Sequence, residues 1–316
     1  MLAALDDAQL TARLATAAVL GQGIGGRTAR LRVGAEPVFV KRVPLTDLER
    51  RPEHTGSTAN LFALPTFYQY GVGSTGFGAW RELAAHTAAT GWVLSGLSPN
   101  FPILHHWRVL PAESRPVPTA EIDTSVAYWD DSAAVRDRLQ AIAAATAELV
   151  LCTEYFPQTQ NDWMLDGGRV DLSRVERAEQ ELRIVTDFLR GQGFVHFDAH
   201  PGNVLADGRH LYLADFGLTL SETFDLSPVE TAFLDRHRDW DRQDVSRCLV
   251  NWLCRRLIPD ADRDAVIRAC VDGAPPPGIP AEAAAVIARH GTTARRLNAF
   301  YDRLVAGPKA TALTVT

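Results

Sequence analysis

Residues 193–217 read GFVHFDAHPGNVLADGRHLYLADFG and hold the densest group of chemically capable side chains in the chain. Asp198 precedes Asn203 by five positions, and Asp215 follows Asn203 after twelve more. Between them, two short apolar runs flank Asp207-Gly208, a dipeptide typical of a two-residue hairpin turn. We expect this hairpin to fold Asp215 back beside Asn203.

Such a hairpin would bring together one carboxylate and two oxygen ligands. Asp198 could accept a proton from a hydroxyl group. Asn203 and Asp215 could bind Mg²⁺, because hard cations prefer oxygen ligands. Taken singly, these residues are ordinary turn formers and strand ends. Together with their neighbours in HFDAHPGN and ADFG they fix five residue types at set spacing, a combination that is rarely found by chance. The joint pattern therefore predicts a site for phosphate chemistry.

The composition narrows the class of protein. With 316 residues, the chain has room for one large domain or two modest lobes. A net charge of −6 argues against a nucleic acid or an anionic membrane as the main partner. Four cysteines without a CxxC pair indicate buried thiols in a reducing compartment, namely Cys152, Cys248, Cys254 and Cys270.

The start of the chain does not resemble an export signal. Asp6, Asp7 and Arg13 interrupt its apolar residues, and no basic segment precedes them. Nowhere do 18 apolar residues run unbroken, so we expect no membrane span and a cytoplasmic protein.

Periodicity and turn residues predict an order of elements along the rest of the chain. The predicted elements are three strands around a glycine-rich turn in 17–43, an inserted loop at 52–78, a helix at 78–92, a strand at 103–110 followed by a proline-rich loop, a helix at 132–148, a strand at 149–156, a helix with apolar positions from Val175 to Leu189, the hairpin, and helices to the C-terminus.

The segments HFDAHPGN and ADFG resemble the catalytic and metal-binding loops of the protein-kinase-like superfamily. The resemblance implies an α+β, bilobal, protein-kinase-like fold. Residues 1–156 would form an N-lobe with an antiparallel sheet and one key helix. Residues 157–316 would form a mainly helical C-lobe that carries the catalytic loop.

The resemblance also assigns roles in an ATP and Mg²⁺ site. Gly21, Gly23 and Gly26 match the glycine-rich loop that approaches the phosphates. Lys41 resembles the lysine that holds the α- and β-phosphates, and Glu82, the single acidic residue of its helix, would pair with Lys41.

The segment TEYF resembles the hinge of the superfamily. Thr153 would occupy the gatekeeper position, and the backbone of Glu154 and Phe156 would bind adenine.

Departures from the pattern bear on the phosphate acceptor. Phe197 replaces the arginine that most protein kinases carry before the catalytic aspartate, so control by a phosphorylated activation loop is doubtful. His200 replaces a lysine, and DxHPGN is the form of aminoglycoside and choline kinase-like enzymes and of atypical coenzyme-Q-associated kinases. No clear Ala-Pro-Glu follows Gly217. These features favour a small molecule or a specialised biosynthetic peptide as the acceptor.

Two alternatives stay open. The intact DFG motif is more typical of protein serine/threonine kinases than of small-molecule kinases. A pseudokinase that binds nucleotide or a partner without catalysis is the other alternative.

Two local features could identify the acceptor. Four acidic residues could attract a cationic acceptor, although a solvated face is the favoured interpretation; they are Asp235, Asp239, Asp241 and Asp244. Aromatic residues of the insert could form a lid or a peptide-binding wall, although local packing is favoured; they are Phe62, Phe67, Tyr68 and Tyr70. His105 and His106 are interpreted as ordinary strand residues.

Overall fold

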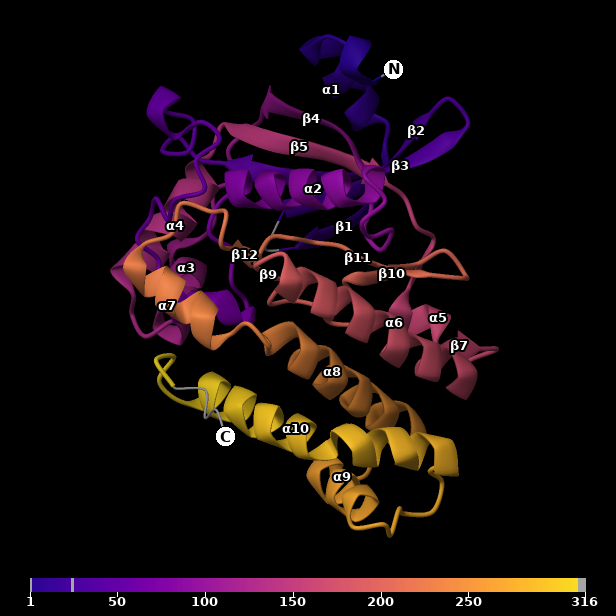
Figure 1. Ribbon diagram of the computed structural model, residues 1–316. Helices are drawn as coiled ribbons and strands as arrows, with labels where there is room; N and C mark the ends of the chain where they lie inside the picture. Colours follow the sequence, from indigo (N-terminus) through magenta and orange to yellow (C-terminus); the bar gives the residue numbers. More distant parts are fainter. Residues whose placement is uncertain (1, 24–25, 312–316) are drawn as a thin grey trace. The chain divides into compact units, whose positions relative to one another are not determined.

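The computed structural model describes residues 2–23 and 26–311 and shows an α+β protein (Figure 1). The chain forms two compact units. The first comprises Met1–Phe156 and Asp215–Asp235, and the second comprises Pro157–Ala214 and Arg236–Thr316. Sequence analysis had assigned 215–235 to the second half. The segment belongs to the first unit because the insert holds it: the Gln69 side chain donates to the Leu218 carbonyl, and Thr58 Oγ1 accepts from the Asp225 amide at 2.8 Å.

A five-stranded antiparallel sheet forms the core of the first unit. Its order is β1-β2-β3-β5-β4, with bounds β1 (Ala18–Gly23), β2 (Gly26–Val33), β3 (Glu36–Leu45), β4 (Leu104–Pro111) and β5 (Ala147–Glu154). The predicted strands around the glycine-rich turn are confirmed. His105 and His106 lie in β4, as predicted.

Alternation along β3 assigns its side chains to two faces. Val38 and Val40 pack into one apolar cluster, and Val43 and Leu45 pack into another. Because successive side chains of a strand point to opposite faces, Lys41 shares a face with Val43 and Leu45. That face is covered by α2 (Ala79–Leu94), through Trp80 and Leu83 (Figure 1). The period of the strand thus directs Lys41 toward α2.

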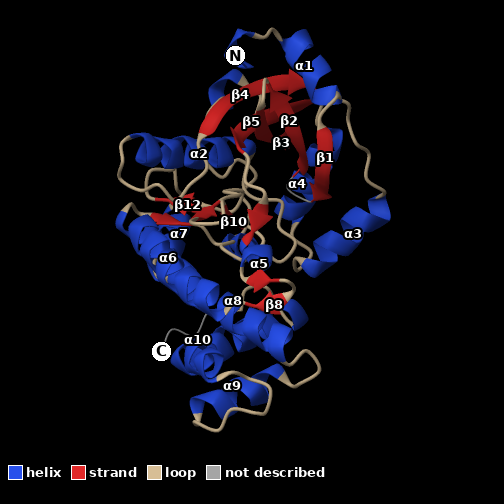
Figure 2. Cartoon of the chain, turned by 90° about the vertical axis from the view of Figure 1, so that its right-hand side faces the viewer, coloured by secondary structure: helices blue, strands red, loops and turns tan. Residues whose placement is uncertain are grey.

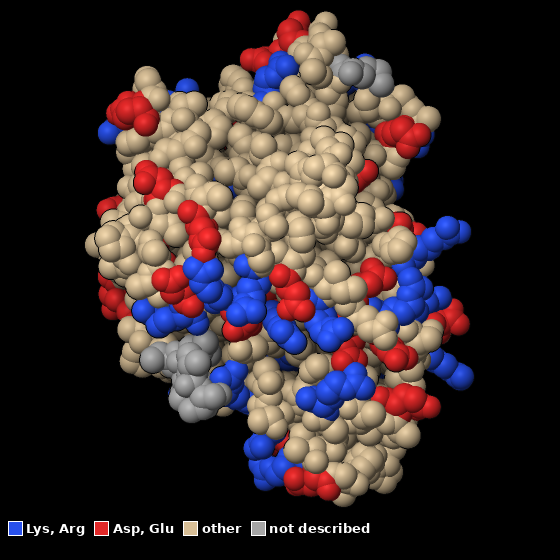
Figure 3. All heavy atoms as spheres, viewed as in Figure 1, with Lys and Arg blue, Asp and Glu red and all other residues tan. Residues whose placement is uncertain are grey.

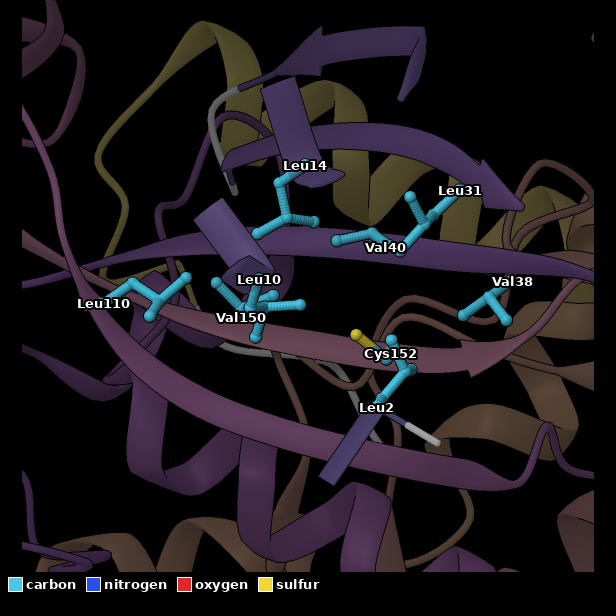
Figure 4. Packing of buried hydrophobic residues seen from close by; sticks show 9 residues of the cluster. All are labelled: Leu2, Leu10, Leu14, Leu31, Val38, Val40, Leu110, Val150 and Cys152. Atoms are coloured by element: carbon cyan, nitrogen blue, oxygen red, sulfur yellow. The ribbon is translucent and has the colours of Figure 1, made fainter. Parts of the chain in front are cut away.

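The opposite face of the sheet is covered by α1 (Asp7–Ala15). Leu10 and Leu14 of this helix lie against Val40 and Val150 (Figure 4). The helix starts with a capping box in which the side chains of Asp6 and Gln9 each accept the other residue's backbone N–H.

The insert at 52–78 folds locally, with two 3₁₀ turns, η2 (Pro52–His54) and η3 (Thr66–Tyr70). The aromatic side chains pack as favoured: Tyr68 and Phe77 are buried in one cluster with Trp129, and Phe62 and Phe67 pack against it. Two predictions nearby were wrong. The proline-rich loop contains α3 (Thr119–Tyr128), and the helix at 132–148 is the shorter α4 (Ala133–Ala144). It ends early because Ala147 already pairs with Leu45 and Pro111 in the sheet.

The second unit is mainly helical. It contains α5 (Gln160–Trp163), α6 (Leu172–Gly191), α8 (Trp240–Leu257), α9 (Arg263–Val271) and α10 (Ala281–Ala306), whereas α7 (Pro228–Arg236) lies almost entirely in the first unit. Short strands accompany these helices, namely β6 (Gln158–Thr159), β7 (Leu165–Asp166), β8 (Arg169–Val170), β9 (Phe194–Val195), β10 (Val204–Ala206) and β11 (Leu211–Leu213). Figure 2 shows α10 running beside α8 and α9.

The predicted hairpin forms between β10 and β11, but its turn is longer than two residues. The connection spans 207–210, because Asp207 Oδ1 accepts the amide hydrogens of both Arg209 and His210 at 2.7 Å. This side chain therefore replaces the tight turn with a four-residue loop.

Acidic and basic residues are mixed on the helical unit. Lys and Arg side chains gather over its helices on the face shown in Figure 3, and Asp and Glu side chains lie among them. Examples are the ion pairs Arg242–Asp187 at 3.3 Å and Arg190–Asp239 at 3.0 Å. All four cysteines are buried and unbridged, as predicted. Among the described residues, no helix combines the length and the apolar character needed to cross a membrane.

The contact between the insert and residue 217 can be tested by substitution. Gly76 has φ +73°, and a Cβ on it would overlap the Gly217 carbonyl oxygen. Gly73 has φ +92° but open space around it, so it is the matched control. We predict that Gly76→Ala lowers the free energy of unfolding by about 1–3 kcal/mol more than Gly73→Ala, measured by urea unfolding. Equal losses would show that only the backbone conformation matters.

Candidate functional site

Three predicted residues meet in the first unit, around the Lys41 ammonium. Lys41 Nζ lies 2.7 Å from Glu82 Oε1 and 2.7 Å from Asp215 Oδ1. A Cβ placed on Gly217 would lie 3.3 to 3.8 Å from side-chain atoms of all three. Residues far apart in the sequence, on β3, on α2 and just after β11, thus form one charge cluster.

Burial decides the electrostatics of this cluster. The side chains of Lys41 and Glu82 are only 8% and 4% exposed, whereas that of Asp215 is 43% exposed. Burial alone would lower the pKa of Lys41, but the charges of Asp215 and Glu82 outweigh it and raise that pKa above its usual range. The lysine is therefore held as a cation.

A glutamate that sequence analysis missed fixes the start of α2. Gly78 at the N-cap has no side chain, and Glu49 Oε1 accepts the Ala79 amide hydrogen at 2.8 Å in its place. Arg138 pairs with the other oxygen of Glu49 at 2.9 Å. A carboxylate at a helix N-terminus is favoured by the helix dipole. Glu49 and Arg138 therefore help to place Glu82.

The structure separates the roles of the predicted loop glycines. Gly21 lies within β1, Gly23 ends it and Gly26 begins β2, whereas Ile24 and Gly25 lie outside the described residues. Gly26 has φ +129°, and a Cβ there would overlap the Arg42 carbonyl, so the sheet itself requires this glycine. A Cβ on Gly23 would meet nothing within 4 Å. The contacts among the described residues therefore do not require a glycine at 23.

The predicted hinge lies at the end of β5. Thr153 is buried, and the Glu154 amide donates to the Ile103 carbonyl at 3.0 Å. The Glu154 side chain accepts the Ile103 amide hydrogen at 2.9 Å. Both backbone groups of Glu154 thus have partners, because its carbonyl accepts from the Thr153 hydroxyl at 3.2 Å. Phe156 follows the strand.

The second unit holds the other two predicted residues on the loop from β9 to β10. Asn203 Nδ2 donates to Asp198 Oδ2 at 2.9 Å and to the Asp198 carbonyl at 3.0 Å. His200 Nε2 lies 3.7 Å from Asp198 Oδ1, and its Nδ1 accepts the Gly202 amide hydrogen. A Cβ on Gly202 would press on the His200 ring. The HPGN segment therefore orients the Asp198 carboxylate.

A buried histidine connects this loop to the hairpin. His196 Nε2 lies 3.0 Å from the Ala214 carbonyl, and its Nδ1 lies 3.2 Å from the Asp198 amide. Since the amide must donate, Nδ1 accepts and Nε2 carries the hydrogen. The Ala214 amide donates to the Asn203 carbonyl at 2.9 Å. Asp215 is the next residue along the chain, so the peptide bond ties it to the same hairpin.

Asp241 binds the backbone at the start of the Asp198 loop, a role that sequence analysis did not predict. Its two carboxylate oxygens accept the amide hydrogens of His196 at 2.6 Å and Phe197 at 2.9 Å. Burial raises the pKa of Asp241 to about 7, although both amides oppose the rise. Phe197 has φ +65°, an unusual conformation for a bulky residue. Asp241 holds the backbone in this conformation.

The acidic run is therefore only partly solvated. Asp235 and Asp239 are exposed, but the interpretation as a solvated face was wrong for Asp241 and Asp244, which are 4% and 3% exposed. Asp244 Oδ1 accepts from Arg247 at 2.7 Å. Both buried carboxylates are committed to the protein's own groups, so neither is available to a cationic acceptor.

Each unit offers one oxygen donor of the type that Mg²⁺ prefers. In the second unit, the Asn203 amide nitrogen is used by Asp198, so its oxygen is the atom suited to a cation, and in the first unit Asp215 has a partly exposed carboxylate. Within the described residues, no group of three or more His, Cys, Asp or Glu side chains is arranged to hold a metal ion. Mg²⁺ does not need such a group, since one or two protein oxygens with phosphates and waters suffice.

A separate cavity of about 700 Å³ lies between α6, α8 and α10 in the second unit. Its charged lining includes Glu179, Arg183, Arg242, Arg289 and His290, and Glu179 pairs with Arg289 and His290. Asp239 of the acidic run lines it, but none of the residues predicted for nucleotide, metal or catalysis does, so the cavity is not the predicted nucleotide site.

Comparison with known proteins neither supports nor opposes the resemblance. No protein-family model matches the chain, and no curated protein is significantly similar to it. The case for function therefore rests on the motifs and on the geometry within each unit.

The charge cluster predicts a pH-dependent loss of stability in Lys41→Met. Burial raises the pKa of Glu82 and the charge of Lys41 opposes that rise, so the variant should leave Glu82 with a raised pKa. The folded variant then binds more protons than the unfolded chain, and its stability falls as pH rises from about 4.5. We predict a deficit of about 3–5 kcal/mol against wild type at pH 8 and a smaller one at pH 5, by urea unfolding.

The double variant Lys41→Met/Glu82→Gln is the control, because it has no buried carboxyl to titrate at this place. Its own stability should therefore fall less between pH 5 and pH 8 than that of Lys41→Met. A pH-independent deficit in Lys41→Met itself would show that Glu82 does not depend on the lysine.

Proposed function

We propose that the protein is an ATP- and Mg²⁺-dependent kinase that transfers the γ-phosphoryl group to a hydroxyl acceptor. The observation that carries the proposal is the buried Lys41 ammonium held between Glu82 and Asp215 at 2.7 Å each. A lysine fixed as a cation beside a part-exposed carboxylate suits the phosphates of a nucleotide.

Each residue has a role that follows from its position. Lys41 would donate to the α- and β-phosphates, and Glu82 would keep Lys41 in place. Mg²⁺ bound by Asn203 and Asp215 would offset charge on the phosphates. Asp198, oriented by Asn203 and the HPGN segment, would accept the proton of the attacking hydroxyl. Transfer then depends on positioning and charge neutralisation.

The proposal includes the bilobal, kinase-like arrangement, with the first unit as the nucleotide-binding lobe and the second as the catalytic-loop lobe. It requires Asp198 and Asn203 to act on the same nucleotide as Lys41. Covalent connectivity supports this requirement. The Asn203 carbonyl accepts from the Ala214 amide, and the adjacent residue, Asp215, reaches Lys41. One proposed metal ligand, Asn203, thus belongs to this hydrogen-bonded pair, and the other, Asp215, is joined to the pair by one peptide bond.

For the acceptor, we propose a small molecule or a specialised biosynthetic peptide. Support comes from the DxHPGN loop and from the segment after Gly217, whose backbone is bound to the insert through Gln69 and Thr58. General protein phosphorylation and nucleotide binding without catalysis are the competing functions.

Replacing the proposed base tests the chemistry. Asp198→Asn should lower phosphoryl transfer by about 10²–10⁴-fold, because the amide cannot accept the hydroxyl proton. Purified protein would be incubated with γ-labelled ATP and a lysate of the source organism split into small-molecule and protein fractions. Asp166→Asn, an exposed aspartate of the same unit, is the control and should transfer normally.

The labelled fraction then distinguishes the acceptors. Label in the small-molecule or peptide fraction supports the proposed acceptor. Label on many unrelated proteins, lost with Asp198→Asn, would favour a protein kinase. Undiminished turnover in Asp198→Asn would rule out the assigned base.

Nucleotide binding can be measured without an acceptor, because Lys41 and Lys309 are the chain's two lysines. We predict that Mg²⁺–ATP slows acetylation of Lys41 by acetic anhydride at least about tenfold and leaves Lys309 unchanged, as followed by peptide mass spectrometry. Protection without transfer to any acceptor or to water would indicate a pseudokinase. Equal rates at Lys41 with and without nucleotide would contradict an ATP site.

A further inference from the structure

The residue next to Glu82 makes a second buried ion pair. Arg81 Nη2 lies 2.7 Å from Glu230 Oε1, and these side chains are 2% and 3% exposed. Arg81 Nε also donates to the Thr58 carbonyl at 2.5 Å. An arginine this deeply buried needs such partners, because desolvation of its charge is costly. Arg81 therefore fixes α2, the insert and α7 to one another.

Two aromatic rings enclose the Arg81 guanidinium. Its central carbon lies 5.2 Å from the Phe77 ring centre and 5.7 Å from that of Phe224. Phe77 comes from the insert and Phe224 from the segment before α7. We use the name Arg81 brace for this group of Arg81, Glu230, Thr58, Phe77 and Phe224.

The far end of the brace is fixed as well. Glu230 Oε2 accepts hydrogen bonds from the Ser227 hydroxyl at 2.9 Å and from the Ser227 amide at 3.1 Å. The Glu230 amide in turn donates to Ser227 Oγ, which completes a capping box at the start of α7. Both carboxylate oxygens of Glu230 are thereby used, so the position of Arg81 is set by a rigid helix end.

Adjacent residues on an α-helix point about 100° apart, so Arg81 and Glu82 face different neighbours. Glu82 contacts Lys41 on the sheet, and Arg81 contacts Glu230. A rotation or slide of α2 large enough to release one pair would strain the other. The segment Asp215–Asp235 is likewise held near both ends, by Lys41 and by Arg81.

We propose that Arg81 and Glu230 are positioning residues that keep Glu82 paired with Lys41, so that the nucleotide site is assembled without phosphorylation of the chain. The effect on catalysis rests on the proposed function. Because Arg81 and Glu230 are both unmodified side chains of this chain, the ion pair forms without a phosphate group. Arg81 and Glu230 thus form a fixed ion pair between α2 and the segment after Gly217. The residue before Asp198 is Phe197, so the chain has no arginine there to bind a phosphorylated residue.

The test measures the reactivity of Lys41 toward acetylation, which rises when its amine loses the carboxylate partners that keep it buried and protonated. Arg81→Met and Glu230→Gln each remove one charge of the pair, and Arg136→Met removes an arginine from the exposed Arg136–Asp123 pair of the same unit as a control. We predict that Lys41 is acetylated about tenfold faster in both brace variants than in wild type and Arg136→Met, without nucleotide. Lys309 is the internal reference and should react at the wild-type rate in all four proteins.

Turnover provides a second measurement. Where transfer is detected, the brace variants should lower kcat more than they raise KM for ATP, and Arg136→Met should change neither. Folded variants with wild-type acetylation at Lys41 would overturn the inference. So would loss of native circular dichroism or faster reaction of Lys309 in both brace variants, since the pair would then serve the fold as a whole. If wild type transfers no phosphate but the brace variants still expose Lys41, the proposed function fails and the positioning role stands.

Discussion

The buried ammonium of Lys41 is the constraint on which the rest of the first unit depends. It needs an anion because its charge is almost out of reach of water, and Glu82 provides one within the core. Asp215 then gives the cluster one excess negative charge, which sits on its most exposed member. A second cation is the natural complement of that charge. The sheet, α2 and the segment that starts at Asp215 must all be in place for this balance to exist.

Sequence reasoning succeeded where the causes are local. The alternation in β3 placed Lys41 on a strand, and the helical stripe around Trp80 and Leu83 placed Glu82 on a helix. The hairpin followed from two short apolar runs and a turn between them. In these cases the pattern that forms the element also orients the side chain. The pairing of Lys41 with Glu82 required one further step, the resemblance to a known arrangement of motifs.

The supports of the site could not be predicted, because their partners are distant in sequence. Glu49 caps α2 from 30 positions away, Asp241 binds the His196 amide from 45, and Glu230 binds Arg81 from 149. A lone charged residue in a sequence is usually solvated, and only its partner shows otherwise. The early end of α4 has the same origin, since an alanine-rich run contains no signal for the strand pairing that stops it.

Two residues of the proposed site, Phe197 and Asp215, have strained backbone conformations. Phe197 and Asp215 both have positive φ, at 65° and 63°, where glycine would be less strained. Such conformations cost about 1–3 kcal/mol each and persist only when surrounding contacts enforce them. Asp241 enforces the first through the Phe197 amide, and Lys41 holds the second through the Asp215 carboxylate. A glycine at 215 would relieve the strain but lose the charge that meets Lys41. The chain keeps the strained carboxylate, which is the choice expected if Asp215 does chemistry and not merely end a strand.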